Sequence, residues 1–436
     1  MTTMTTAATS ADSPIFAPIA LGPLRARGRL FKAATSETRA TPDGHVTDEL
    51  LAFYEPIFRA GTPLVITGNS YPSPQGKSTP LQAGCDADDK IPGLRRWADL
   101  AHRHGSALVA QINHAGRQVF PASVGLPGAV SASNVTDKVM GTRPRALTYT
   151  EVREVVDSFA AAAGRCRDAG FDGIQIHSAH GYLVNQFLTP YTNRRRDEYG
   201  GGFANRLRLL IEIHRAVRSR VDDRCAVILK LNGTDYLPLR RGLRTDELIE
   251  IARVMQEEGV DAVEISVGHY ESGLPMVRGT FDRYFPGVLD EGMGPYMPRW
   301  RRTGMRIVRP LAAAALNLIW PHREGFNLRY ARRFKAALRI PVICVGGFLT
   351  RAAMEEALRE HACDAISCGR TMIADPLLYR HLREGTTGPR CVFCNACVAR
   401  VGGRPVDCYH PDVRAEKDRM LAAEPRTAPD AVGAGA

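Results

Sequence analysis

The sequence lacks any long hydrophobic run. No stretch of about 18 consecutive apolar residues occurs in the 436-residue chain, so we expect no helix that spans a membrane. The first dozen residues are small and polar, without the basic and apolar regions of a secretory signal. We therefore expect a cytoplasmic protein whose residues 1–13 form a disordered tail.

The sequence also lacks the signatures of nucleic-acid-binding proteins. It has no helix-turn-helix or RNA-binding motif, although its formal net charge is +11. A basic surface of this kind is either simply solvated or attracts anionic cofactors, acyl-CoA-like substrates or an acidic membrane face. Hydrophobic residues make up 44% of the chain, enough for a full globular core. These features favour an enzyme acting on a small molecule and exclude nucleic acid as a partner.

A disulfide framework is not expected from the ten cysteines, because no secretory signal precedes them. Several occur singly in apolar surroundings, as Cys225, Cys344 and Cys368 do, and are expected to be small buried hydrophobes. The remaining four form a group near the C-terminus.

Eight short apolar segments alternate with amphipathic helical patterns along the chain. Such a rhythm predicts an α/β fold with eight βα units, closed into a (β/α)₈ TIM barrel. The expected strands lie at residues 29–34, 64–68, 107–113, 172–177, 226–231, 261–266, 342–347 and 364–369. The predicted domains are a barrel over 14–388, a cysteine-rich extension over 389–412 and a largely disordered tail over 413–436.

A long insertion, residues 271–327, follows the sixth expected strand. Loops of this length are usually lids or binding segments. It contains several arginines and an apolar stretch ending in LNLIWP, which suits a flap over a bulky or anionic substrate. The same composition fits a segment that touches a membrane surface, or one that packs on the barrel flank. Because the apolar stretch is short, we favour the lid and packing interpretations.

Polar residues and glycines follow several of the expected strands. In a TIM barrel the active site lies at the carboxyl ends of the strands, so these residues should converge on one mouth. The glycine pair Gly346 and Gly347, and Gly369 followed by Arg370, fit a phosphate site; alternatively they form tight turns with a structural arginine.

Lys230, near the end of the fifth strand, has three open interpretations. It could form a Schiff base with a carbonyl substrate, hold negative charge on a cofactor ring, or be a satisfied lysine at the rim. A barrel lyase that uses Lys230 is therefore an alternative function.

The four grouped cysteines are spaced C-x₂-C-x₂-C-x₁₀-C. They are Cys391, Cys394, Cys397 and Cys408. Four thiolates with short spacers suit a [4Fe–4S] cluster or zinc, and the alternative is a set of metal-free thiols. A metal-binding or redox-sensing protein is thus a second alternative function.

The segment HSAHGYLVNQFLTPYTNRRRDEYGG places His177, His180 and Tyr182 just beyond the fourth strand. Histidine and tyrosine side chains can donate hydrogen bonds to a carbonyl oxygen and transfer a proton, or they can pack as core side chains. With FKAATSE, VITGN, QINHAGR and CGRTMIADP, this segment resembles the Old Yellow Enzyme family of FMN-dependent NAD(P)H oxidoreductases over residues 15–383.

The resemblance implies a role for each matching residue. The residues that would contact the FMN ring or phosphate are Ala33, Ala34, Thr35, Ser36, Gly68, Asn69, Gln111, Lys230, Gly346, Gly347, Gly369 and Arg370. His177 and His180 would bind the carbonyl oxygen of a conjugated substrate, and Tyr182 would protonate its α-carbon. The implied reaction is hydride transfer from NAD(P)H through flavin N5 to an α,β-unsaturated carbonyl compound, such as a steroid-like enone or an acyl-CoA.

One branch of the family, similar to 2,4-dienoyl-CoA reductases, carries a [4Fe–4S] cluster near the position of the four cysteines. The spacing differs from that branch in the third gap, and no G-x-G-x-x-G follows to bind a dinucleotide. The resemblance therefore leaves the cluster, zinc and free thiols all open.

Overall fold

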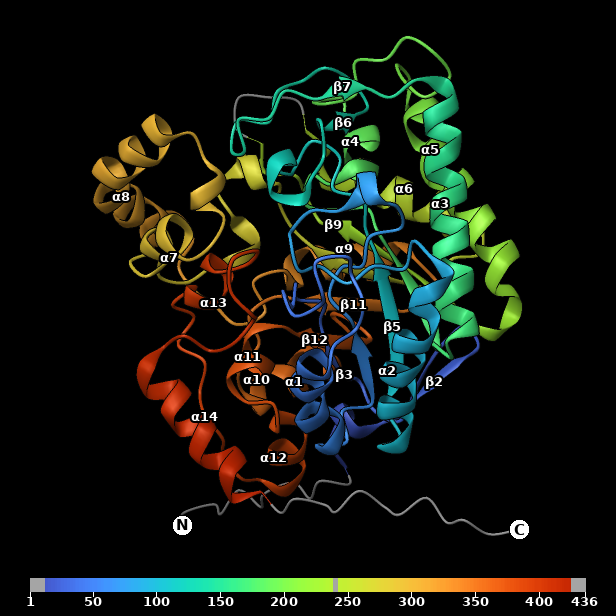
Figure 1. Cartoon of the computed structure of the whole chain (residues 1–436). Helices are drawn as coiled ribbons and strands as arrows, with labels where there is room; N and C mark the ends of the chain where they lie inside the picture. Colours follow the sequence, from blue (N-terminus) through green and yellow to red (C-terminus); the bar gives the residue numbers. More distant parts are fainter. Residues whose placement is uncertain (1–11, 238–241, 425–436) are drawn as a thin grey trace, which may run out of the picture.

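Eight parallel strands form a closed barrel in the computed structural model, which describes residues 12–237 and 242–424 (Figure 1). The barrel strands in chain order are β3 (Leu30–Lys32), β4 (Leu64–Ile66), β5 (Ala107–Ile112), β8 (Gly173–His177), β9 (Ala226–Asn232), β10 (Ala262–Ser266), β11 (Val342–Val345) and β12 (Ala365–Cys368). Each pairs with the next, and β12 pairs with β3 to close the ring. The predicted TIM barrel is confirmed.

Helices surround the barrel and connect consecutive strands. They are α1 (Asp48–Arg59), α2 (Ile91–Arg103), α3 (Tyr149–Asp168), α4 (Leu183–Leu188), α5 (Phe203–Val221), α6 (Thr245–Glu257), α9 (Leu328–Ala337), α10 (Arg351–Arg359), α11 (Arg370–Ala374) and α12 (Leu378–Glu384). Their apolar faces pack on the outer side of the strands in one large core. The strands are therefore buried on both faces, which explains why they are near-continuous apolar runs in the sequence.

The start of α3 shows how local sequence sets these boundaries. Thr148 accepts a hydrogen bond from the backbone N–H of Glu151, and the Glu151 carboxylate accepts from the Thr148 N–H, a capping box. Both otherwise unpaired donors are thereby satisfied.

A short hairpin closes the amino end of the barrel. Strands β1 (Ile19–Leu21) and β2 (Leu24–Ala26) pair antiparallel. Leu21 and Leu24 pack with Phe31 and Ile66 in an inner core that fills this end. A further small pair, β6 (Val130–Ser131) with β7 (Arg145–Ala146), lies in the loop after β5. Only the carboxyl end of the barrel is therefore left to form a site.

The insertion after β10 is largely helical. It contains 3₁₀ turns at Tyr270–Ser272, Pro275–Val277 and Gly294–Tyr296, and the helices α7 (Tyr284–Asp290) and α8 (Arg299–Ile319). In Figure 1 these two helices stand beside the carboxyl end of the barrel, with α8 at the outer edge of the molecule.

The C-terminal extension contains α13 (Ala396–Ala399) and α14 (Pro411–Ala423). The expectation of a disordered tail from residue 413 is therefore wrong as far as Ala423. Val413 is buried against Val406 and Cys408, and Glu424 forms ion pairs with Arg59 and Arg380, so this segment is attached to the barrel flank. The rest of that expected tail, and residues 1–11, lie outside the described residues.

Two expectations about the whole chain concern the cysteines and the membrane. All ten cysteines are free thiols, as the absence of a disulfide framework requires. Among the described residues, no helix has the length and apolar character needed to cross a bilayer.

Candidate active site

A cavity of about 330 Å³ opens at the carboxyl ends of the barrel strands. Its volume is within the usual range for ligand pockets. Nearly every predicted site residue lines it: Ala33, Ala34, Thr35, Ser36, Asn69, Gln111, His177, His180, Tyr182, Lys230, Gly346, Gly347, Gly369 and Arg370. Residues distant in the sequence thus meet in one place because parallel barrel strands all end at the same rim.

Gly68 is not among the residues that line this cavity. Its backbone N–H donates to the Glu37 carboxylate at 2.5 Å and to the Tyr54 hydroxyl oxygen at 3.2 Å. A Cβ at this position would lie 2.0 Å from Glu37 Oε2, so only glycine allows the approach. Gly68 therefore packs two loops together beneath the cavity wall.

A tight turn explains how His177, His180 and Tyr182 come together. His180 and Gly181 both adopt the left-handed region, with φ of 61° and 83°. This conformation is uncommon for histidine and indicates a constrained site. A Cβ on Gly181 would meet the ring of His269 at 2.5 Å. The turn ends at Tyr182, which is the N-cap of α4. The ring centroid of Tyr182 lies 4.9 Å from that of His177.

The two histidines form a neutral pair. Their ring centroids are 5.0 Å apart, and His180 Nε2 lies 2.7 Å from the Ser266 hydroxyl. Burial, together with the positive charge of Lys230, holds the pKa of both rings well below the ordinary value. Nδ1 of His177 accepts the backbone N–H of Ala179 at 3.3 Å, so the proton of its neutral ring is assigned to Nε2.

The Tyr182 phenol is protonated at neutral pH. Burial raises its pKa well above the ordinary value, and Tyr270 nearby raises it further, while the Gln118 side chain partly offsets this. Tyr182 can therefore act as a proton donor, and its anion would be costly in this setting.

The floor of the cavity is a buried polar network on neighbouring strands. Lys230 Nζ lies 2.7 Å from Glu264 Oε2, and Gln175 donates to the same oxygen at 3.0 Å. Gln111 in turn donates to Gln175 at 2.5 Å. Burial alone would raise the Glu264 pKa, but the Lys230 charge and these hydrogen bonds outweigh it and lower that pKa. The network fixes the orientation of Gln111 and Lys230 at the cavity surface.

A second buried lysine lies beside this floor. Lys32 Nζ donates to the Ala33 carbonyl at 2.6 Å and to the Thr35 hydroxyl at 2.9 Å. Burial lowers its pKa to about 8, and the charge of Lys230 contributes to the shift. Lys32 therefore orients the backbone segment predicted to contact a flavin.

The glycines after β11 and β12 allow the backbone of these two loops to come close to neighbouring groups. Gly347 has φ of 69°, and a Cβ on Gly346 would lie 3.0 Å from the backbone nitrogen of Asn327. Gly369 is the N-cap of α11 and faces open space, since its nearest Cβ contact would be Thr35 Cγ2 at 3.4 Å. Arg370 donates to the Arg278 carbonyl at 2.8 Å and to the Asn395 amide oxygen at 2.5 Å. The arginine thus bridges the barrel, the insertion and the cysteine extension.

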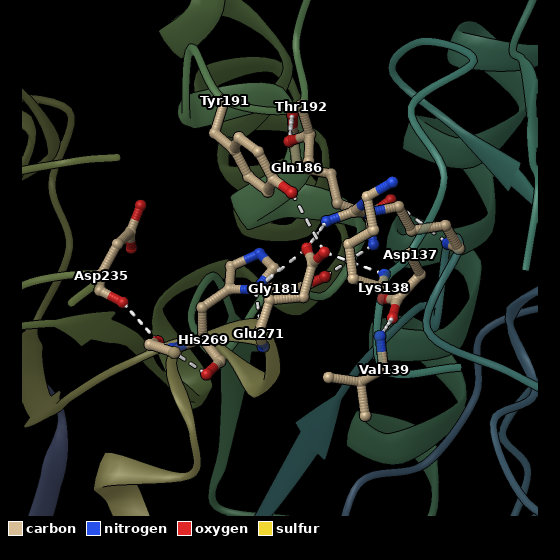
Figure 2. Close-up of polar contacts among 12 residues, drawn as sticks. Asp137, Lys138, Val139, Gly181, Gln186, Tyr191, Thr192, Asp235, His269 and Glu271 are labelled. Atoms are coloured by element: carbon tan, nitrogen blue, oxygen red, sulfur yellow. Dashed lines mark hydrogen bonds and ion pairs between the residues drawn. The ribbon is translucent and has the colours of Figure 1, made fainter. Parts of the chain in front are cut away.

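Glu271, at the start of the insertion, fixes the roof of the cavity. Figure 2 shows its carboxylate between Tyr191 and the backbone of Lys138. The Tyr191 hydroxyl donates to it at 3.0 Å and the Lys138 N–H at 2.9 Å, and it also forms a fully buried ion pair with Arg117. Since Tyr191 belongs to the histidine-containing motif, the insertion is tied to the same segment that carries Tyr182.

The four grouped cysteines lie together but do not converge. All four line a small cavity of about 20 Å³ beside Arg370 and Phe393. Among the described residues, no three His, Cys, Asp or Glu side chains are close enough to hold a metal ion. Burial raises the pKa of Cys391 to about 11 and that of Cys397 to about 12. The donor set suits a thiolate-ligated metal, although in this arrangement the four side chains do not converge.

Several residues of the site were not predicted. They are Lys32, Gln118, Gln175, Glu264 and Tyr270. Three of them, Lys32, Gln175 and Glu264, are polar residues that interrupt apolar strands, and this interruption is a signal in the sequence. Gln118 lies in the loop after β5, where no such signal exists. Tyr270 begins the insertion, whose position over the cavity no local pattern indicates.

The cavity has the donors and acceptors that FMN needs. Open glycine backbone and Arg370 suit a phosphate, and Lys230 at the cavity surface suits an electron-rich ring. Asn327 Oδ1 is buried without a partner and its side chain lines the cavity, so it can accept from a hydroxyl. The residues present therefore fit this cofactor.

Fold and site together define a flavin-binding barrel enzyme. Residues 14–285 match the NADH:flavin oxidoreductase / NADH oxidase family, and the chain belongs to it. This confirms the predicted resemblance and the class of FMN-dependent oxidoreductases.

Two relatives illustrate the range within the family. The chain is 31% identical over 395 residues to an NADH oxidase of Thermoanaerobacter brockii, covering 89% of this chain and 54% of the relative. It is 32% identical over 402 residues to a 4,4'-dithiodibutanoate disulfide reductase of Rhodococcus erythropolis, covering 90% of this chain and 94% of that protein. The chain thus spans little more than half the length of the former relative and nearly all of the latter.

Solved structures support the fold. A 2-naphthoyl-CoA reductase complex aligns with a TM-score of 0.78 at 24% identity, covering 94% of this chain and 59% of that chain. A morphinone reductase complex with tetrahydroNAD aligns with a TM-score of 0.64 at 22% identity, covering 92% of this chain and 99% of that chain. At these identities the likeness concerns the barrel architecture.

Proposed function

We propose that this protein is an FMN-dependent NAD(P)H oxidoreductase that reduces the C=C bond of an α,β-unsaturated carbonyl compound. The observation that carries the proposal is the grouping of His177, His180 and Tyr182 around the cavity that the expected flavin-contacting residues line. Bound FMN would accept hydride from NAD(P)H and deliver it to the substrate.

The side chains of the site have complementary roles in this reaction. A neutral His177 that carries its proton on Nε2 donates to the substrate carbonyl oxygen, as a donor in an oxyanion hole does. His180, hydrogen-bonded to Ser266, shares this task. The electron-poor β-carbon then accepts hydride, and the protonated Tyr182 supplies the proton to the α-carbon. Met293, Met297 and Tyr284 of the insertion line the cavity and exclude water from it.

The lyase alternative is less well supported. A Schiff base requires a free amine, whereas Lys230 Nζ is held 2.7 Å from Glu264 Oε2 in a buried ion pair. The same charge suits a reduced flavin ring. Family membership also favours the flavin reaction.

The cysteines Cys391, Cys394, Cys397 and Cys408 are the residues that would hold an iron–sulfur cluster, as a second redox group. Their shared cavity supports this proposal. Cluster binding would require the side chains to turn toward one another and lose their protons.

The test is an absorption spectrum of protein purified without oxygen, followed by NAD(P)H and then by cyclohexenone. We expect flavin bands that bleach with NAD(P)H and return with the enone. A colourless protein that takes up no added FMN, but whose Lys230 is trapped on a carbonyl compound by borohydride, would replace the proposal with the lyase.

A further inference from the structure

Helix α8 presents an apolar face to solvent. Most of the large hydrophobic side chains that the described part of the chain exposes lie between residues 296 and 319. Trp300, Ile307, Leu311 and Leu318 are 75–83% exposed, and their spacing of seven, four and seven residues puts them on one side of the helix. Buried Ala313 lies on the opposite side, which faces the molecule. The packing interpretation of the insertion does not account for this stripe.

The same helix is strongly basic. Between residues 299 and 319 it has no acidic side chain and carries Arg299, Arg301, Arg302, Arg306 and Arg309. Arg299 and Arg309 are exposed, while Arg306 pairs with Asp290 of α7 at 2.5 Å and Arg301 donates to the backbone of the 138–139 loop. At 100° per residue, Arg299, Arg301 and Arg306 flank the apolar stripe, whereas Arg302 and Arg309 lie on the other side of the helix.

Two aromatic side chains extend this surface at its amino end. Tyr296 is 41% exposed and Trp300 is 78% exposed, in a turn and a helix that follow each other directly. Tyrosine and tryptophan combine an apolar ring with a polar group and prefer the boundary between water and lipid. In Figure 1 α8 projects at the outer edge of the molecule, so a flat surface can reach it.

We propose that α8 docks on an anionic membrane surface, with Trp300, Ile307, Leu311 and Leu318 inserted among the acyl chains and the arginines among acidic headgroups. A helix with an apolar face, a tryptophan and a cationic remainder is the typical form of an interfacial helix. A second copy of the chain is disfavoured as the occupant, because two such helices face to face would bring their arginines together without acidic partners. The inference concerns where the enzyme works and does not depend on its substrate.

Vesicle flotation with the FMN-loaded full chain tests the proposal. We compare vesicles of phosphatidylcholine alone with an equal mixture of phosphatidylcholine and phosphatidylglycerol. We expect binding to the mixture only, weakened by added salt, and Leu311→Glu/Leu318→Glu should reduce it by about tenfold or more. Arg299→Gln removes an exposed arginine that flanks the stripe and should reduce binding about fivefold.

Matched controls separate docking from general charge and from misfolding. Arg224→Gln/Arg339→Gln removes two exposed arginines elsewhere on the surface and should leave binding unchanged. Of the three tryptophans, Trp97 is buried and Trp300 is exposed, so Trp300→Phe should abolish the blue shift of emission on binding. None of the varied residues lines the cavity, so oxidation of NAD(P)H with a soluble enone should stay at the wild-type rate.

Three results would overturn the proposal. One is absence of binding to both vesicles, and another is equal binding to both, unaffected by the leucine substitutions. The third is a dimer in sedimentation that Leu311→Glu/Leu318→Glu converts to a monomer without any vesicle binding, which would assign the stripe to a second copy of this chain.

Discussion

Lys230 and Glu264 are directly opposed partners on the adjacent strands β9 and β10, with their charged groups 2.7 Å apart beneath the cavity. Both are buried, with 4% and 0% of their surface exposed. Each charge therefore depends on the other for its stabilisation. The position of Lys230 is fixed by a carboxylate that the parallel pairing of β9 with β10 brings near.

Replacing Lys230 with Met should leave the Glu264 carboxylate buried without its cation. We expect the free energy of unfolding to fall by about 3–5 kcal/mol, measured by denaturant titration. The double variant Lys230→Met/Glu264→Met should recover most of this loss. As a control, Arg339→Met removes an exposed pair with Glu257 and should cost less than about 1 kcal/mol. Equal losses for the two single variants would show that burial does not make the Lys230 pair special.

Tyr182→Phe should separate the two halves of the catalytic cycle. Flavin reduction by NAD(P)H should be unchanged, whereas enone reduction should slow by about 10²–10⁴-fold, because a general acid is lost. Stopped-flow absorbance measures both steps. Tyr284→Phe is the matched control, since Tyr284 also lines the cavity and has no assigned role in proton transfer. Equal slowing of both half-reactions by Tyr182→Phe would contradict the proton-donor role.

His214 makes stability depend on pH. It is buried in α5 with both ring nitrogens unpaired, and burial lowers its pKa from the ordinary 6.5 to about 4. As the pH falls, the unfolded chain therefore binds a proton at His214 before the folded chain does. The contribution of neutral His214 to the free energy of unfolding is present above pH 6.5 and is lost as pH falls toward 4. His214→Leu should flatten the fall in unfolding free energy across this window by up to about 1.4 kcal/mol per pH unit.

His102, whose pKa is shifted in the opposite direction, provides the control for this measurement. The hydrogen bond with Asp172 raises the pKa of His102, so its contribution is present at low pH and is lost as pH rises through the raised value. His102→Gln should therefore steepen the loss of stability at acid pH. An identical pH profile for His214→Leu and the wild type would show that folding does not lower the pKa of His214.

The cysteine extension can be tested by its metal content. Protein purified without oxygen should contain iron and acid-labile sulfide, and Cys394→Ser should lose both while keeping FMN. Cys344→Ser is the matched control, because Cys344 is buried in β11 outside the group. Zinc in place of iron, or neither metal, would contradict the iron–sulfur proposal.

The barrel could be predicted because its strands carry their own signal. Parallel strands buried on both faces are apolar throughout, and each was bounded by a helix of clear periodicity. The motif around His177 similarly contains the whole proposed catalytic group, since these residues are close in sequence. The insertion was expected as a lid-like loop, and its two helices were not foreseen because their partners are elements distant in the sequence.

Side-chain surroundings were harder to predict than positions. The contact of Gly68 with the cofactor, which the resemblance implies, stays a prediction; its N–H donates to Glu37, a partner that no local pattern indicates. The spacing of the cysteines predicts a metal site. Whether the four thiols converge depends on how the chain folds back to place Cys408 beside the other three.

The sequence by itself determined the eight βα units, the family and the identity of the histidine pair and tyrosine, because each rests on local periodicity or on a contiguous motif. Only the tertiary structure decided the protonation of these groups, the pairing of Lys230 with Glu264 and the exposure of the α8 stripe. Burial and electrostatic neighbours arise from segments far apart in the chain, and no window of sequence contains them.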